Sequence, residues 1–186
     1  MSESLSSRKA SEMFAPIETE RLCLRALETG DAEAVRSYRI LPEVARFQRW
    51  GTDSVESIKA DIDAMKTRAI STPGQWYQVG ICLRSTGKLI GDCGLRVPES
   101  NRKQVEIGIT LNPAMQGKGY ATEALRAFMD YLFTGLGKDA IFATVDAANT
   151  RSAALMLRLG MRKVERHGEQ QNDELEEVFE IVKEKY

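Results

Sequence analysis

The segment NPAMQGKGYATEAL, residues 112–125, joins a run of alternating residues to a run with helical spacing. A loop of small residues before a helix leaves backbone N–H groups unpaired at the positive end of the helix dipole, where phosphate groups bind. Gly117 and Gly119 matter because a side chain there would hold a ligand away from the backbone. The segment therefore predicts an anion site, with a simple tight turn as the alternative.

Two well-known phosphate-binding motifs do not fit this loop. A P-loop requires Ser or Thr after its Gly-Lys pair, whereas here Lys118 is followed by Gly119. A dinucleotide-binding loop has a third glycine where this chain has Thr122. A dinucleotide-binding loop also belongs to the opening βαβ unit of its domain, whereas the loop of this chain lies in the middle. A nucleotide-binding function is therefore disfavoured.

The loop must be held by a sheet and helices, which hydrophobic periodicity locates. Strands are expected at 21–27, 76–84, 88–97, 104–111, 140–145, 161–167 and 177–183, and helices at 31–40, 53–70, 120–132 and 149–160. The order βααβββαβαββ predicts a mixed-sheet α/β domain, and short turns make its three central strands an antiparallel meander. We expect one domain over 16–186, after a polar, flexible tail over 1–15.

Composition excludes several classes of function. With 26 basic and 27 acidic side chains, the chain has no global field that would attract nucleic acid or an anionic membrane. Cys23, Cys82 and Cys93 lack metal-ligand spacing and lie in apolar segments, so we interpret them as reduced core residues of a cytoplasmic protein. His167 is the only histidine, which argues against a zinc cluster or a histidine-based triad. No metal is expected.

A third loop pattern does fit. The stretch QGKGYA resembles the Gln/Arg-x-x-Gly-x-Gly/Ala signature of the GCN5-related N-acetyltransferases, the GNAT superfamily, with Gln116, Gly119 and Ala121 in the defining places. EIGITL before the loop, ATEAL after it and N-x-x-S…LGM further on agree with that resemblance, as does the element order from Arg21 to the end. RLCLRALETGDAEAV and QGKGYATEAL are similar to the branch that contains the ribosomal-protein N-terminal (RimJ/RimL-type) acetyltransferases.

This resemblance implies a GNAT fold, with a central mixed, largely antiparallel sheet and helices on both faces. It also implies acetyl transfer from acetyl-CoA to a primary amine by direct attack in a ternary complex. The CoA pyrophosphate would bind the loop amides, and the pantetheine arm would pair with the preceding strand, which diverges from the next one. The resemblance assigns cofactor binding to Ile109, Leu111, Gln116, Gly117, Lys118, Gly119, Tyr120, Ala121, Thr122, Asn149 and Ser152. Lys118 has a solvated loop lysine as its alternative interpretation.

The reaction requires a neutral amine, whereas an alkyl amine with a pKa of about 10 is protonated at pH 7. Glu106 occupies the place where some family members have a glutamate that acts as a general base through water, so the resemblance implies that catalytic role. By alternation Glu106 shares a strand face with Gly108 and Thr110, and the small Gly108 would leave room for the thioester or a water. A salt-bridged or exposed glutamate is the alternative.

Asn149 and Ser152 have the spacing of a helix N-cap and its first turn. The resemblance adds a catalytic interpretation, in which Asn149 contacts the cofactor arm or a site water and Ser152 contacts a polar cofactor group. Many relatives have a tyrosine that protonates the leaving thiolate where this chain has Met156. The general acid is therefore unassigned, with water or the Ser152 hydroxyl as candidates. Arg151 and Arg158 either meet the 3′-phosphate or form a solvated helix face.

The expected partners are acetyl-CoA and an amine acceptor, and the resemblance is also compatible with a homodimer. The acceptor, either a protein N-terminal amine or a small-molecule amine, is not readable from the sequence. It would be shaped by the first two helices and by the acidic loop HGEQQNDELEE, residues 167–177. A GNAT-like sensor that binds acyl-CoA without turnover is the alternative function, and Met156 supports it.

Overall fold

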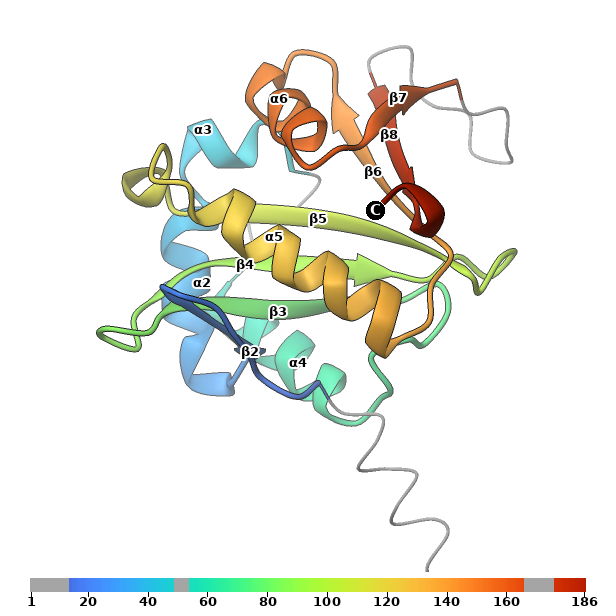
Figure 1. The fold of residues 1–186 in the computed structure, drawn as a ribbon. Coiled ribbons are helices and arrows are strands. Elements are labelled where there is room, and N and C mark those ends of the chain that lie inside the picture. Colours follow the sequence, from blue (N-terminus) through green and yellow to red (C-terminus); the bar gives the residue numbers. More distant parts are fainter. Residues whose placement is uncertain (1–13, 49–53, 166–175) are drawn as a thin grey trace, which may run out of the picture.

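A computed structural model describes residues 14–48, 54–165 and 176–186. Eight strands form one mixed sheet in the order β1-β2-β3-β4-β5-β6-β8-β7 (Figure 1). The strands are β1 (Ile17–Glu18), β2 (Leu22–Ala26), β3 (Trp76–Leu83), β4 (Leu89–Arg96), β5 (Gln104–Leu111), β6 (Ala140–Asp146), β7 (Arg162–Val164) and β8 (Glu176–Val182). All neighbouring strands pair antiparallel except β5 and β6, which confirms the predicted meander and the mixed sheet.

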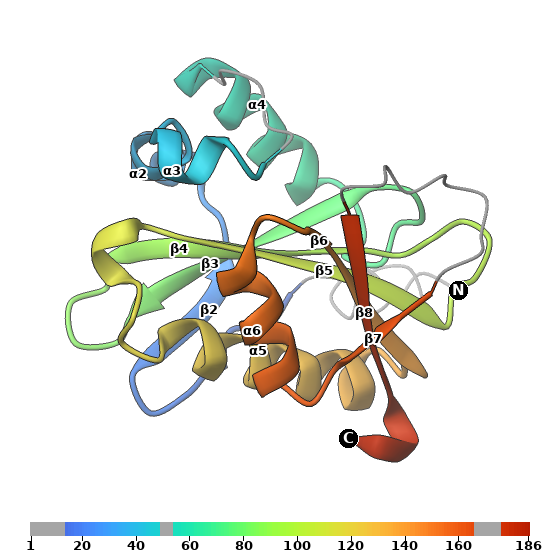
Figure 2. The ribbon, with the colours of Figure 1, turned by 90° about the horizontal axis from the view of Figure 1, so that it is seen from above.

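Helices cover both faces of the sheet (Figure 2). On one face lie α2 (Ala32–Arg39), α3 (Pro42–Ala45) and α4 (Val55–Lys66), and on the other lie α5 (Tyr120–Asp130) and α6 (Thr150–Arg158). The predicted order is confirmed, with β1 and α3 as additions. Pro42 ends α2, as expected, and then opens α3, because the fixed φ of proline suits a first helical turn. No helix in the described part of the chain is long and apolar enough to cross a membrane.

The N-terminal segment packs earlier than expected. The tail predicted over 1–15 lies outside the described residues as far as residue 13. Phe14, by contrast, is only 6% exposed and belongs to the core. Its ring makes edge contacts with Phe128 and Tyr131, at centroid distances of 6.2 and 5.2 Å. An aromatic side chain gains more from burial than the chain loses by ordering a residue or two, so Phe14 and the residue after it belong to the packed domain and not to a flexible tail.

The sheet opens between β5 and β6. These two strands are parallel, but they pair only over Gln104–Glu106 with Ala140–Phe142. Beyond that point β5 stays paired with β4 as far as Leu111, and β6 stays paired with β8 as far as Asp146. Because each strand keeps its antiparallel neighbour, the twist of the two halves separates them. The divergence that the family resemblance implied is therefore present.

A buried ionic cluster fixes α2 to the sheet beside this opening. The Asp92 carboxylate on β4 is 2% exposed and accepts hydrogen bonds from the Tyr38 hydroxyl, at 2.5 Å, and from the Arg39 guanidinium, at 3.0 Å. Burial, reinforced by the Asp92 charge, raises the pKa of Tyr38 well above its usual value, so the hydroxyl remains a donor. Asp92 lies directly opposite Thr110 of β5. The cluster thus holds α2, and α3 after it, over the end of β5.

Removing one partner of this cluster should destabilise the fold measurably. Asp92→Asn removes the charge that neutralises the buried Arg39, and we expect it to lower the free energy of unfolding by about 3–5 kcal/mol. Tyr38→Phe should cost about 1–3 kcal/mol, because one buried carboxylate oxygen loses its donor. Urea denaturation measures both. Glu18→Gln, in an exposed pair with Arg84, is the control, with an expected change of about 0–1 kcal/mol. Equal effects at the buried and exposed sites would contradict this account.

Candidate active site

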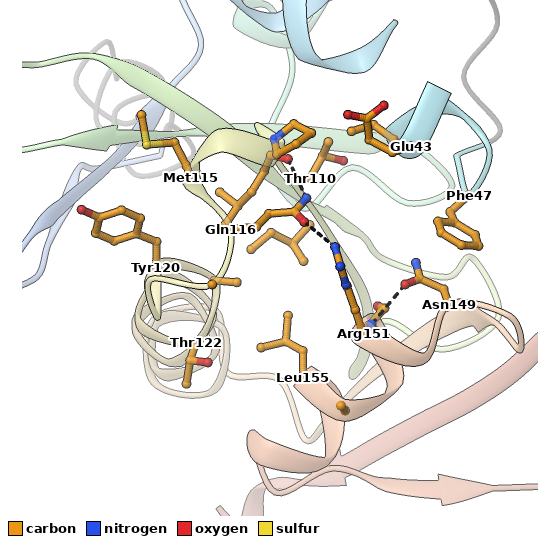
Figure 3. A pocket seen from close by; sticks show the side chains of 18 of the residues that line it. Glu43, Phe47, Thr110, Met115, Gln116, Tyr120, Thr122, Asn149, Arg151 and Leu155 are labelled. Carbon is orange, nitrogen blue, oxygen red and sulfur yellow. Dashed lines mark hydrogen bonds between the residues drawn. The ribbon is translucent and has the colours of Figure 1, made fainter. Parts of the chain in front are cut away.

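A cavity of about 990 Å³ lies where β5 and β6 diverge. Its walls are the end of β5, the loop after it with the first turn of α5, the N-terminal turns of α6, and residues 43–48 of α3 and the segment that follows (Figure 3). The volume is at the upper end of the range for ligand pockets, which suits a long ligand or two ligands together. The opened sheet therefore forms a binding site of substantial size.

The loop before α5 presents a row of free backbone donors to this cavity. Gly117 and Gly119 have φ values of 76° and 82°, a conformation that only glycine adopts without strain. Gly119 is the N-cap of α5 and supplies no side-chain cap. Within the described residues, the backbone N–H groups of 117–122 donate no hydrogen bond. The turn thus satisfies both requirements of an anion site: unpaired N–H groups and the positive end of a helix dipole.

Arg21, from the start of β2, fastens this loop from outside the cavity. Its Nη1 donates to the Lys118 carbonyl oxygen at 3.0 Å, its Nε donates to the Glu123 carboxylate at 2.6 Å, and its guanidinium lies 4.7 Å from the Tyr120 ring centroid. The Glu123 carboxylate also accepts from the Arg21 backbone N–H at 2.9 Å and from the Thr19 hydroxyl at 2.6 Å. Partial burial would raise the pKa of Glu123, but these hydrogen bonds and the Arg21 charge lower it below its usual value. Glu123 is therefore ionised at neutral pH.

The free edge of β5 faces the same cavity. The Leu111 carbonyl accepts a hydrogen bond from Gln116 Nε2 at 3.2 Å, and alternation turns the backbone groups of Ile109 toward the same edge. The Thr110 side chain lies on the face of the sheet that α3 covers, opposite to the face of the Ile109 and Leu111 side chains. Its hydroxyl accepts a hydrogen bond from Gln48 Nε2 at 2.9 Å. This confirms the alternation expected for the strand. The edge can extend a ligand's hydrogen-bonding pattern as a neighbouring strand would.

The N-terminus of α6 forms the facing wall. Asn149 caps the helix, because its side-chain oxygen accepts from the Ser152 backbone N–H at 3.2 Å, as the sequence predicted. Both side chains also line the cavity, so the cap does not prevent a ligand contact. Arg151 and Arg158 line it as well, and Arg151 Nη1 approaches the Gln116 side-chain oxygen at 3.4 Å. Arg151 therefore adds positive charge beside the loop, and Arg158 adds it further along α6.

Glu106 lies apart from the cavity lining. It is 7% exposed, and one carboxylate oxygen accepts from both Nε, at 2.9 Å, and Nη2, at 2.5 Å, of Arg96. The Arg96 guanidinium in turn lies 5.4 Å from the Trp76 ring centroid. A Cβ added at Gly108 would meet only that ring, at 3.8 Å, so the ring covers Gly108 at ordinary van der Waals distance. Glu106 is therefore salt-bridged to Arg96, which is the alternative stated for it above. Its role as a general base stays a prediction.

The structure gathers most, but not all, of the predicted site residues. Those that line the cavity are Ile109, Leu111, Gln116, Gly117, Gly119, Tyr120, Ala121, Thr122, Asn149 and Ser152. Lys118 is not among them, since its ammonium group turns back to donate to the Ala114 carbonyl at 3.0 Å. Met156 is 2% exposed in the core and is also absent from the lining. The acidic loop expected to shape the acceptor site lies outside the described residues as far as residue 175.

Several residues that line the cavity or hold its loop could not be identified from the sequence. Glu43, Phe47 and Gln48 reach the cavity from a helix of only four residues and the turn after it, which is too short for periodicity to reveal. Arg21 meets the loop across about a hundred residues of chain, a separation over which spacing rules say nothing. Thr110 was recognised only as a neighbour of Glu106 on the strand face. Tertiary packing alone brings these residues to the site.

Comparisons with known proteins agree with this geometry. The family model described as an acetyltransferase (GNAT) domain matches residues 21–162. An uncharacterized N-acetyltransferase, p20 of Bacillus licheniformis, is 34% identical over 145 residues, which cover 78% of this chain and 81% of that protein. A GNAT-family acetyltransferase structure from Bacillus anthracis is 27% identical, with a TM-score of 0.76, and covers 91% of this chain and 99% of its own. Mycobacterium smegmatis RimJ has a similar fold, with a TM-score of 0.72 at 22% identity, over 91% and 87% of the two chains.

Loss of the Arg21 contacts should loosen the loop. We expect Arg21→Ala to accelerate hydrogen exchange about tenfold at the first hydrogen-bonded amides of α5, beginning with the Glu123 N–H that donates to the Gly119 carbonyl, because the loop loses the hydrogen bond to Lys118 and the contact with Tyr120. Arg21→Lys should restore only part of the protection, since one ammonium group cannot make both contacts. Mass spectrometry of exchanged peptides measures the effect. Lys163→Ala is the control, because Lys163 pairs with Glu177 on the surface and, among the described residues, makes no contact with the loop or its anchor. Equal acceleration in both variants would contradict the assigned role.

Proposed function

The chain belongs to the GNAT acetyltransferase family, and from this premise we propose that it is an N-acetyltransferase whose amine acceptor attacks acetyl-CoA directly, with both substrates bound in the cavity between β5 and β6. Family membership by itself supports the general reaction, in which an acyl group passes from acetyl-CoA to an amine. The observation that carries the proposal is the opened sheet, with free backbone donors at one end and a free strand edge along one side.

The cofactor fits this arrangement from end to end. The pyrophosphate is assigned to the backbone N–H groups of 117–122, which supply hydrogen bonds and dipole attraction without a bulk positive charge. Arg151 and Arg158 of α6 also line the cavity. Their guanidinium groups suit a further phosphate of the cofactor. The pantetheine arm would run along the free edge of β5 toward Ile109. The thioester then lies between the end of β5 and Asn149.

In the proposed reaction the nitrogen lone pair of the neutral amine attacks the thioester carbonyl carbon. Negative charge develops on the carbonyl oxygen, and a backbone N–H on the β5 edge is suited to stabilise it. The C–S bond then breaks, the thiolate leaves and accepts a proton, and the amine nitrogen loses one. Water or the Ser152 hydroxyl is the proton donor to the thiolate, since Met156 has no proton to give.

Glu106 remains our candidate for the group that accepts the amine proton. Its Oε2 is held by Arg96, whereas Oε1 makes no hydrogen bond to any described residue. Glu106 and Thr110 are four residues apart on β5, about 13 Å along the strand, so a proton could pass between this carboxylate and an amine near Thr110 only through water. We therefore propose a water-mediated transfer, with the Arg96 pair holding the carboxylate in place.

A thiol-release assay tests the proposed function. Purified protein with acetyl-CoA should release CoA in the presence of primary amines, and mass spectrometry should find the amine product heavier by one acetyl group. Acetyl-CoA binding is measured separately by calorimetry. Binding without thiol release on any primary amine would contradict the proposal, and so would the absence of binding.

The base role predicts a specific kinetic signature for Glu106→Gln. Turnover at pH 7 should fall about a hundredfold, the usual range for loss of general base catalysis, while the acetyl-CoA dissociation constant changes little. The residual rate should rise with pH, because more of the amine is then neutral. Glu18→Gln, which breaks an exposed pair with Arg84, is the control. If Glu106 serves only the ion pair with Arg96, the variant will lose thermal stability and keep its turnover.

A further inference from the structure

We propose that the cavity end beneath α3 is the acceptor subsite, and that Glu43 there binds an acceptor that arrives as a cation and has no carboxylate beside its amine. This inference rests on the proposed function. It concerns the part of the reaction that neither the sequence nor the family assigns, which is the chemical class of the acceptor.

The position of the subsite follows from the two ends of the cavity. Figure 3 shows Tyr120 and Thr122 at one end, and Glu43, Phe47 and Asn149 at the other. The first end holds the free loop N–H groups, where an anionic cofactor is bound. A cofactor anchored there and extended along β5 brings its reactive group toward the second end. The acceptor must therefore enter between α3 and the end of β5.

Glu43 supplies the charge at this end. It is the only carboxylate among the described residues that line the cavity. It is exposed, and no described residue donates a hydrogen bond to it or forms an ion pair with it. Gln48 and Thr110, which lie nearby, bond to each other, since Gln48 Nε2 donates to the Thr110 hydroxyl at 2.9 Å. Glu43 is thus the group in this subsite that is available to a cation.

Arg46 carries the positive charge next to Glu43, and its guanidinium is already in contact with a ring. The Arg46 guanidinium lies on the Phe47 ring, 4.3 Å from its centroid, so its face is occupied by a cation–π contact. An alkyl amine has a pKa of about 10 and reaches the protein as an ammonium ion, which a free carboxylate attracts. A carboxylate on the same acceptor would approach Glu43 as a like charge, which disfavours amino acids relative to the amines without that carboxylate.

The test uses matched acceptors that differ by one carboxylate. The pairs are tyramine with tyrosine, and 1,4-diaminobutane with ornithine, assayed by thiol release. For the protein as it stands we expect kcat/KM to favour the amine without the carboxylate at least tenfold. Glu43→Gln should raise KM for that amine about tenfold with little change in kcat, because a binding charge is lost and the chemistry is not. A general base would instead show its loss in kcat.

Two further variants complete the test. Arg46→Gln should lower KM for the cationic amine, since it removes a repelling charge from the subsite. Glu18→Gln, at an exposed carboxylate on β1 outside the cavity lining, is the control and should leave both constants unchanged. Calorimetry should give the same acetyl-CoA affinity for all three variants.

The outcomes are distinguishable. Turnover in which tyrosine or ornithine is preferred, or in which Glu43→Gln leaves KM unchanged, would overturn the acceptor assignment and leave the acetyltransferase intact. A preference for the carboxylate-bearing acceptor that Arg46→Gln abolishes would show that α3 recognises an anion instead. No thiol release on any amine would overturn the proposed function and this inference with it.

Discussion

The separation of β5 from β6 is the constraint on which the remaining structure depends. Each strand follows its antiparallel neighbour, β4 or β8, and the parallel pairing between them lasts for three residue pairs only. Had the pairing continued, the backbone groups of Ile109 and Leu111 would have been used within the sheet. Because it stops, the sheet has an edge inside the protein that no described strand pairs with, bordered by helices of both layers, and among the described residues only the Leu111 carbonyl there accepts a side-chain hydrogen bond, from Gln116. An unpaired edge in this position favours a ligand that can complete it.

The surrounding elements keep this opening in shape without filling it. Arg21 and Glu123 hold the loop from outside, so its unpaired N–H groups are held in place before any ligand arrives. The Tyr38–Asp92–Arg39 cluster anchors α2 on the opposite face, directly across from Thr110. Both devices use charged groups that are paired within the protein. The free-energy cost of ordering the site on binding is then smaller, which is the benefit of a preorganised pocket.

Charge is distributed along the cavity according to what each end has to bind. Backbone donors and the Arg151 guanidinium lie at one side, while Glu43, the only carboxylate of the described lining, stands at the other with Arg46 beside it. Glu106 is the second carboxylate of interest, and its environment differs: it is buried against Arg96, whereas Glu43 is exposed and has no partner among the described residues. Two carboxylates in such different surroundings are suited to different tasks, one to a fixed position near the chemistry and one to attraction of a mobile cation.

Local patterns in the sequence determined the order of the elements, the meander, the face shared by Glu106 and Thr110, the Asn149 cap and the glycine loop. Periodicity, caps and glycine positions act over a few residues, so a single sequence records them directly. The Arg21 contacts, the turning of Lys118 away from the cavity, the Arg96 pair and the approach of α3 were decided only by tertiary structure. They depend on where β5 leaves β6 and on how α2 and α3 pack over the sheet. Those distances join segments far apart in the chain, and no local spacing encodes them.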